Sequence, residues 1–383
     1  MPWAGPGFPL STFGGGGRPA RDGTLGAGRP FLGAPGLGHA SFIHCELSKP
    51  LSCSVPLPLS TFGGGDDTLP LAMPMHPVLQ LISQRFQHAQ PGVAGVAHAP
   101  TAAQMVTSVP GTSAVVLDSP HSGTCYPDDF GSCLPLATLR QAEDTHVEKI
   151  YAFAPSLGVS WVEAHFPRIY LDANRDTTEV DTGMMDGNWP LPVTEDQVVL
   201  QKVRLGKGLI WKFTDAGVPI YERALSVDEL LARIERCWKP YHAAVAKAID
   251  AAHARHGYSI HINCHSMPAV AASHATLHPG LVHADFVIGD RDGSTADTRL
   301  SQRICAFLRE RGYSVDYNHP YKGVELVRRY GNPADNRHSI QIEINRKLYM
   351  DEQTLELDQA GYLRLTKDLQ ALVEDLLALD PRV

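Results

Sequence analysis

The sequence predicts an α/β protein in which helices cover both faces of a mostly parallel β-sheet. From about residue 76 onward, short apolar runs alternate with amphipathic stretches of helical length. Two of these apolar runs, 113–117 and 258–264, lead directly into a His-Ser pair, at His121 and at His265. Functional groups in such sheets lie beyond the carboxyl ends of the strands, so the two imidazoles are candidates for one shared metal ion.

The expected elements follow in chain order. Residues 113–117 and 159–165 are predicted strands, and an amphipathic helix is expected over 138–153. A long helix is predicted over 226–256, where Ser226 and Glu229 form a capping-box pattern, Pro240 should kink or divide the helix, and Gly257 ends it. Further strands are expected at 258–264, 285–288, 313–317 and 338–345, and further helices at 295–311 and 357–379.

Residues 1–75 differ from the remainder because they are rich in glycine and proline and poor in charge. The octapeptide PLSTFGGG stands at residues 9–16 and again at 58–65. Two copies are too few for a repeat architecture, and this composition does not favour a packed core. We expect this segment to be disordered or to precede a natural start at Met73 or Met75, and residues 76–383 to form one α/β hydrolytic domain.

Composition excludes several classes of protein. The net charge of −8 argues against binding to nucleic acid or to an anionic membrane surface. No apolar stretch approaches the roughly 18 residues of a membrane span, and no basic segment with an apolar core begins the chain. The seven cysteines form no CxxC pair, which is typical of reduced thiols. We therefore expect a cytoplasmic protein.

His121 and His265 are the strongest candidates for metal ligands, since each is expected in a loop directly after a strand. A catalytic zinc site takes three protein ligands, and a carboxylate would complete the pair of histidines. The chain offers four carboxylates near His121: Asp128, Asp129, Glu143 and Asp144. No HxxE or HExxH spacing selects among them, and two loop histidines with unrelated roles are the alternative.

Polar residues also line one face of two predicted strands. Gln341, Glu343 and Asn345 alternate with isoleucines in one, and the other places His261 on the same face as His265. Central strands of a covered sheet are usually apolar on both faces, so the pattern favours an exposed edge strand slightly over the wall of a site for 338–345. His261 is expected to be a packed histidine rather than a ligand.

Two loop segments carry further candidates. In RIYLDANRD, at 168–176, charged residues alternate with apolar ones, and an arginine there could bind a carboxylate in bidentate fashion. An ordinary surface ion pair of Arg175 with Asp172 or Asp176 is the alternative. The turn NHPYKG, at 318–323, carries a phenol and an amine that suit a mobile substrate loop, although a plain polar loop has the same composition.

Taken together, the chain resembles the N-formylglutamate amidohydrolase family, which is distantly similar to zinc carboxypeptidases. The resemblance rests on seven stretches in order: SPHSGTCYP (119–127), EDTHVEKIY (143–151), RIYLDANRD (168–176), INCHSMP (262–268), DFVIGDRDGSTAD (285–297), NHPYKG (318–323) and IQIEINRKLYMDE (340–352). The fold it implies is a three-layer, zinc-carboxypeptidase-like α/β sheet.

The resemblance also implies a site. It makes His121 and His265 ligands of Zn²⁺ or another divalent transition metal. Thr124 stands where carboxypeptidases have a ligating Glu, so Asp144 is expected as the third ligand, with Asp128 second. The remaining implied residues are Glu343 as general base, Asn174 and Arg175 for the substrate α-carboxylate, Tyr321 closing over it, and Arg168 and Arg346 as further anchors. Asn263 replaces an Asp of many relatives, which should lower metal affinity.

The implied reaction is hydrolysis of N-formyl-L-glutamate to formate and L-glutamate, a step of histidine breakdown. Its partner would be a small acidic N-acyl amino acid. A deacylase or carboxypeptidase acting on another N-acyl amino acid or small peptide is the first alternative, because one methylene changes discrimination by only about 1–3 kcal/mol. A non-catalytic protein that binds acidic ligands is the second, and Glu343 beside both histidines argues against it.

Overall fold

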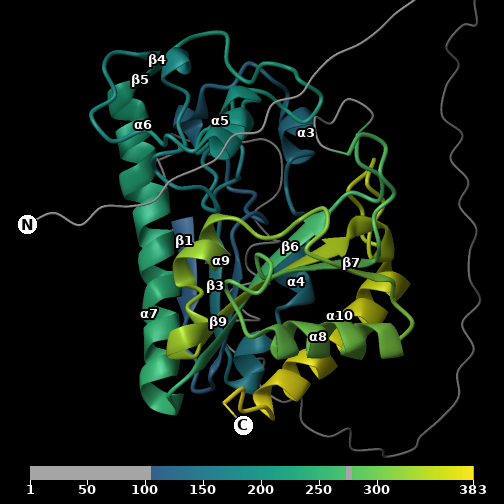
Figure 1. Ribbon diagram of the computed structural model, residues 1–383. Helices are drawn as coiled ribbons and strands as arrows, with labels where there is room; N and C mark the ends of the chain where they lie inside the picture. The colour runs from purple at the N-terminus through teal and green to yellow at the C-terminus, as the bar shows by residue number, and fades with distance from the viewer. Residues whose placement is uncertain (1–104, 273–277, 383) are drawn as a thin grey trace, which may run out of the picture. The chain divides into compact units, whose positions relative to one another are not determined.

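The computed structural model describes residues 105–272 and 278–382 (Figure 1). A seven-stranded sheet runs through them in the order β1-β3-β2-β6-β9-β7-β8. Its strands are β1 (Val106–Val109), β2 (Val115–Ser119), β3 (Ser160–Ala164), β6 (Ser259–Met267), β7 (Phe286–Gly289), β8 (Val315–Tyr317) and β9 (Arg337–Asn345). Two short strands, β4 (Met185–Asp186) and β5 (Leu225–Ser226), pair separately.

The four central strands β3, β2, β6 and β9 are parallel, whereas β1 and β7 join them in antiparallel orientation. The mostly parallel sheet is therefore confirmed. The expectation of an exposed edge for 338–345 is wrong, because β9 lies between β6 and β7 and is buried from His338 to Asn345. Its polar face is thus a wall inside the molecule.

Helices cover both faces of this sheet, as predicted. The described helices are α3 (Leu136–Arg140), α4 (Val147–Ile150), α5 (Gln197–Arg204), α6 (Val227–Arg233), α7 (Lys239–His256), α8 (Thr298–Glu310), α9 (Glu325–Tyr330) and α10 (Gln359–Leu377). On one face, α4, α8 and α10 pack on strand residues such as Leu117 and Ile262. On the other, α7 packs on β2, β3 and β6, in the core cluster that includes Val116 and Val162, and Figure 1 shows α7 opposite α8 and α10.

The predicted helix over 138–153 is wrong. The chain forms the short helices α3 and α4 instead, and His146 between them has a positive φ of 70°. The turn allows the backbone amide of Asp144 to donate to the carbonyl oxygen of His121 at 3.0 Å. In a continuous helix, the Asp144 amide would donate to a carbonyl oxygen of the helix itself. The contact with His121 therefore goes together with the break between α3 and α4.

The helical stretch predicted over 226–256 begins and ends at the residues that its capping pattern indicates. The Ser226 hydroxyl accepts a hydrogen bond from the Glu229 amide at 3.1 Å, and Gly257 ends α7 with a φ of 74°. Pro240 lies at the start of α7, directly after the π-helical turn Ile234–Trp238 that divides the stretch. The elements β1, α5 and α9 were not predicted.

No helix among residues 105–272 and 278–382 is long and apolar enough to cross a membrane. The expectations for residues 1–75 lie outside the described residues and stay predictions.

Candidate metal centre

The two predicted histidines meet at the carboxyl ends of adjacent parallel strands. His121 follows the end of β2 by two residues. His265 lies inside β6 rather than in a loop beyond it, because β6 continues to Met267. The centroids of the two rings are 4.6 Å apart, and both side chains are buried. Parallel pairing of β2 with β6 thus brings together residues 144 positions apart.

A carboxylate completes the group. One ligand atom from each of His121, Asp144 and His265 lies within 4.8 Å of the others. Oδ2 of Asp144 is 3.4 Å from Nδ1 of His121 and 2.9 Å from Nδ1 of His265. Asp128 is instead exposed in the 3₁₀ turn Asp128–Phe130, and Glu143 accepts from the Tyr126 hydroxyl at 2.8 Å. Geometry therefore groups Asp144 with the histidines, as a candidate ligand.

Hydrogen bonds to the far nitrogens fix how the two rings face this group. Nε2 of His121 lies 2.6 Å from Oδ1 of Asp172, and Nε2 of His265 lies 2.7 Å from Oδ1 of Asn263. Both oxygens accept hydrogen bonds, so an Nε2 hydrogen on each ring would satisfy them, and the Nδ1 atoms, which face Asp144, are the ones placed to bind a metal.

The donor set fits a divalent transition metal. Nδ1 of His121 is buried and has no hydrogen-bond partner among the described residues, an arrangement that native proteins rarely leave uncompensated. Two imidazole nitrogens and one carboxylate are the ligand types of a catalytic zinc site.

Glu343 lies directly beside this group. The register of β6 and β9 pairs it with His265, and the Gln341 side-chain amide donates to its Oε1 at 2.8 Å. Burial, followed by the negative charge of Asp144, raises the pKa of Glu343 well above its ordinary value, against Arg168 and Arg346. Two neighbouring carboxyls with divergent proton affinities are typical of acid–base chemistry.

The pKa of Asp144 is shifted in the opposite direction from that of Glu343. Burial opposes its ionisation, but the neighbouring His121 and His265 imidazoles and the charge of Arg168 outweigh burial and hold the pKa of Asp144 well below the ordinary value. Asp144 is therefore a carboxylate, as a metal ligand must be.

Arg168 and Arg346 both reach the Asp144 carboxylate. Nη1 of Arg168 lies 3.7 Å from Oδ1 of Asp144, and Nη2 of Arg346 lies 3.2 Å from the same oxygen. Arg346 also donates from Nε to the Ser266 hydroxyl at 3.1 Å. Although the chain as a whole is acidic, two guanidinium groups therefore lie beside the metal group.

The other predicted residues lie in different surroundings. Asn174 stands behind His265, with Nδ2 3.1 Å from its Nε2, while Arg175 donates from Nε to the Lys207 carbonyl oxygen at 3.0 Å. Tyr321 is half-buried, and burial together with the charge of Glu343 raises the pKa of its phenol. The substrate-binding roles of all three stay predictions.

His261 bonds to buried groups on both nitrogens, in agreement with a packed histidine. Its Nδ1 lies 2.7 Å from the Ser339 hydroxyl, and its Nε2 lies 2.9 Å from Oδ1 of Asp118.

Sequence reasoning missed the site roles of Asp172, Lys207 and the Trp211 ring between them. Asp172, considered only as a surface partner of Arg175, is fully buried and also accepts from Trp211 Nε1 at 3.2 Å. Lys207 lies with Nζ 3.5 Å from the Trp211 ring centroid, and burial lowers its pKa to about 8. Only tertiary contacts reveal these residues, since no motif spacing links them.

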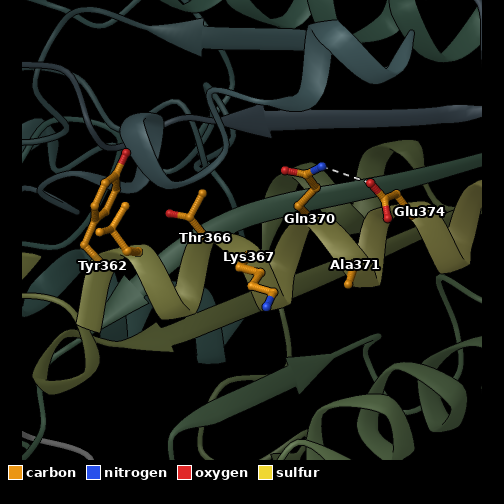
Figure 2. A pocket seen from close by; sticks show the side chains of 7 residues that line it. Tyr362, Thr366, Lys367, Gln370, Ala371 and Glu374 are labelled. Carbon is orange, nitrogen blue, oxygen red and sulfur yellow. Dashed lines mark hydrogen bonds between the residues drawn. The ribbon is translucent and has the colours of Figure 1, made fainter. Parts of the chain in front are cut away.

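A separate surface groove runs along α10 (Figure 2). Its walls come from Tyr362, Leu363, Thr366, Lys367, Gln370, Ala371 and Glu374, all on that helix. Gln370 donates to Glu374 at 2.9 Å, and no residue of the metal group lies there. The groove therefore lacks the convergent polar groups of a catalytic site.

Comparison with known proteins identifies the family of this chain. The sequence profile of N-formylglutamate amidohydrolase matches residues 113–350. The chain belongs to the N-formylglutamate amidohydrolase family. It is accordingly a hydrolase that acts on an amide carbon–nitrogen bond, and the resemblance seen in the sequence motifs is confirmed.

Individual relatives and a solved structure are similar to this chain and carry the same family name. An N-formylglutamate deformylase of Pseudomonas putida is 28% identical over 246 residues, covering 62% of this chain and 82% of the relative. One from Pseudomonas aeruginosa is 29% identical over 272 residues, covering 69% and 92%. The crystal structure of an N-formylglutamate amidohydrolase from Ralstonia eutropha JMP134 superposes with a TM-score of 0.67 at 43% identity, covering 71% of this chain and 97% of that one.

Proposed function

We propose that this enzyme hydrolyses N-formyl-L-glutamate to formate and L-glutamate with the help of a divalent transition metal, most simply Zn²⁺. The observation that carries the proposal is the buried group of His121, Asp144 and His265 beside Glu343, in a chain of this family. The three side chains would hold the metal. Bound there, the metal would lower the pKa of a water molecule to about 7 and polarise the formamide carbonyl.

Glu343 is the proposed general base. Its carboxylate takes a proton from the attacking water as the new carbon–oxygen bond forms. The same proton passes to the glutamate nitrogen as the carbon–nitrogen bond breaks. The raised pKa of Glu343 favours uptake of a proton, which suits a general base.

The substrate carries two carboxylates, which an acidic protein must attract locally. Arg168 and Arg346 supply guanidinium groups beside Asp144, and Lys207 adds a third cation on the Trp211 side. Guanidinium groups bind carboxylates through paired hydrogen bonds, so Arg168 and Arg346 are the proposed main anchors. Asn174 and Arg175 are proposed for the α-carboxylate, with Tyr321 closing over the substrate.

We also infer the setting of the reaction. N-formyl-L-glutamate hydrolysis is a step of histidine breakdown, which takes place in the cytoplasm. The thiols of Cys133, Cys237, Cys264 and Cys305 are free, which supports a reducing compartment.

The test is formate release from N-formyl-L-glutamate by the full chain, before and after chelation and after Zn²⁺ is restored. We expect chelation to abolish release and Zn²⁺ to restore it. Glu343→Gln should lower turnover by about 10²–10⁴-fold while metal content is retained. Glu374→Gln, in the α10 groove, makes the same chemical change away from the site and should behave like the parent.

Two results would count against the proposal. Zinc-containing protein that releases no formate would move the substrate to another N-acyl amino acid or a small peptide. Protein that neither binds metal nor releases formate would refute the metal centre itself.

A further inference from the structure

An exposed carboxylate pairs with one of the cations near the metal group. Asp215 stands in the turn 214–218, where the Thr214 amide donates to the Val218 carbonyl oxygen at 2.9 Å. Oδ1 of Asp215 lies 2.8 Å from Nζ of Lys207. The Asp215 side chain is 64% exposed, whereas that of Lys207 is 21% exposed. The turn thus holds a mobile-sided, solvent-facing acid against a half-buried lysine.

The charge of Asp215 also acts on the groups proposed to bind the substrate. The surrounding protein raises the pKa of Asp215, whereas nearby positive charges lower it. Lys207 contributes most, followed by Arg168 and Arg346, and the pKa of Asp215 lies below its ordinary value. Burial and negative charges that include that of Asp215 raise the pKa of the Tyr321 phenol. An internal carboxylate therefore lies among the cations that would bind a substrate carboxylate.

Lys207 lies further from the metal group than the two arginines. Both arginines contact Asp144 itself. Lys207 is linked to the group through Trp211, since its Nζ lies 3.5 Å from the centroid of that ring. Nε1 of the ring donates to Asp172 at 3.2 Å. Positive charge is therefore present both at the metal group and beyond it.

The two carboxylates of N-formyl-L-glutamate are spaced in the same way. The α-carboxylate is attached to the carbon that bears the formamide nitrogen, whereas the side-chain carboxylate lies two methylene groups beyond that carbon. With the formamide at the metal group, the side-chain carboxylate extends further outward than the α-carboxylate. An ammonium group beyond the arginines matches that carboxylate in charge and in order.

We propose that Lys207 determines specificity by binding the side-chain carboxylate of the substrate, and that Asp215 pairs with Lys207 until the substrate replaces it. This inference rests on the proposed function, because it divides the two carboxylates of that substrate between separate cations. Asp215 lies on an exposed turn, so its carboxylate is hydrated when the substrate displaces it. Lys207 exchanges one carboxylate for another and keeps its charge paired.

The surroundings of Lys207 favour binding over a purely structural role. Burial lowers the pKa of Lys207 to about 8, although the charge of Asp215 raises it. An ion pair with one exposed partner contributes little to stability. A cation held in a desolvated place for so little stability is typical of a functional site.

The test compares N-formyl-L-glutamate with N-formyl-L-glutamine. The second ligand keeps the α-carboxylate and has a neutral amide in place of the side-chain carboxylate. Dissociation constants are measured by calorimetry on zinc-loaded chains that carry Glu343→Gln, in which turnover is blocked. Lys212→Met is the matched control, because Lys212 forms a similar ion pair with Asp181, at 2.9 Å, on the same loop.

We expect Lys207→Met to weaken N-formyl-L-glutamate binding by about 10–100-fold, because one charge-assisted contact is lost. Binding of N-formyl-L-glutamine should change by less than about threefold. Asp215→Asn should tighten N-formyl-L-glutamate binding by about two- to fivefold, because an exposed ion pair no longer competes, and should leave N-formyl-L-glutamine unchanged. Lys212→Met should leave both ligands near the parent.

Three results would overturn the inference: equal binding of both ligands by the parent, an equal loss for both in Lys207→Met, or no tightening of N-formyl-L-glutamate in Asp215→Asn. The last variant alters an exposed turn, so it decides even where Lys207→Met does not fold. Calorimetry needs no turnover. A chain with the expected binding pattern but no formate release would support the role of Lys207 and refute the proposed reaction alone.

Discussion

Asp172 is the residue whose replacement should affect stability and metal binding together. Its buried carboxylate accepts four hydrogen bonds, two on each oxygen. Oδ1 accepts from Nε2 of His121 at 2.6 Å and from the backbone N–H of Asn174 at 2.9 Å. Oδ2 accepts from Nη2 of Arg168 at 3.1 Å and from Nε1 of Trp211 at 3.2 Å.

Asp172→Asn keeps the shape but exchanges one accepting oxygen for an NH₂ group. Whichever way the amide turns, two of the four donors then face another donor. Each buried donor without an acceptor costs about 1–3 kcal/mol, and the Arg168 contribution is reduced because that side chain is 20% exposed. We expect the free energy of unfolding of the metal-free protein to fall by about 3 kcal/mol.

Metal binding should weaken as well, by about 10–100-fold, because His121 loses the carboxylate that fixes its ring. Urea unfolding followed by circular dichroism measures the first effect, and chelator competition measures the second. Asp375→Asn is the matched control, since its partner Arg303, at 2.6 Å, is half exposed to solvent and the pair should contribute under about 1 kcal/mol. An Asp172→Asn protein as stable as this control, or with parental metal affinity, would refute the reasoning.

Three further outcomes are expected. Arg233→Met should lower the free energy of unfolding by about 3–5 kcal/mol, because the fully buried guanidinium bonds Glu229 at 2.7 Å and the Tyr221 hydroxyl at 2.8 Å; a loss under about 1 kcal/mol in urea unfolding would contradict this. Burial lowers the pKa of His242 from 6.5 to about 4, so the unfolded chain takes up a proton first and stability should decline as pH falls from 6.5 to 4. His242→Gln should remove up to about 3 kcal/mol of that decline, and an unchanged pH profile would exclude His242 as its source. Arg346→Met should raise KM for N-formyl-L-glutamate by about 10–100-fold, because the substrate loses one charge-assisted hydrogen bond. An unchanged KM would show that Arg346 is not part of the binding site.

Local sequence pattern predicted most of the central elements. Apolar runs gave strands near β2, β3, β6, β7, β8 and β9, and the Ser226 and Gly257 signals marked the ends of the α6–α7 stretch. The same reasoning failed for β9 as an edge strand, since alternation reports which residues share a face and not what covers that face. It also failed for 138–153, where long-range contacts of Asp144 accompany a turn inside a helical pattern.

The sequence by itself determined that two histidines stand at the ends of strands and that Glu343 lies on the polar face of a third strand. These follow from periodicity, which is a local property of the chain. Only the tertiary structure decided that Asp144 rather than Asp128 joins the histidines. It also placed Asp172 and Asn263 at their far nitrogens. Such choices depend on hydrogen bonds between residues far apart in sequence, because a buried polar group takes whichever partner the packed sheet brings within reach.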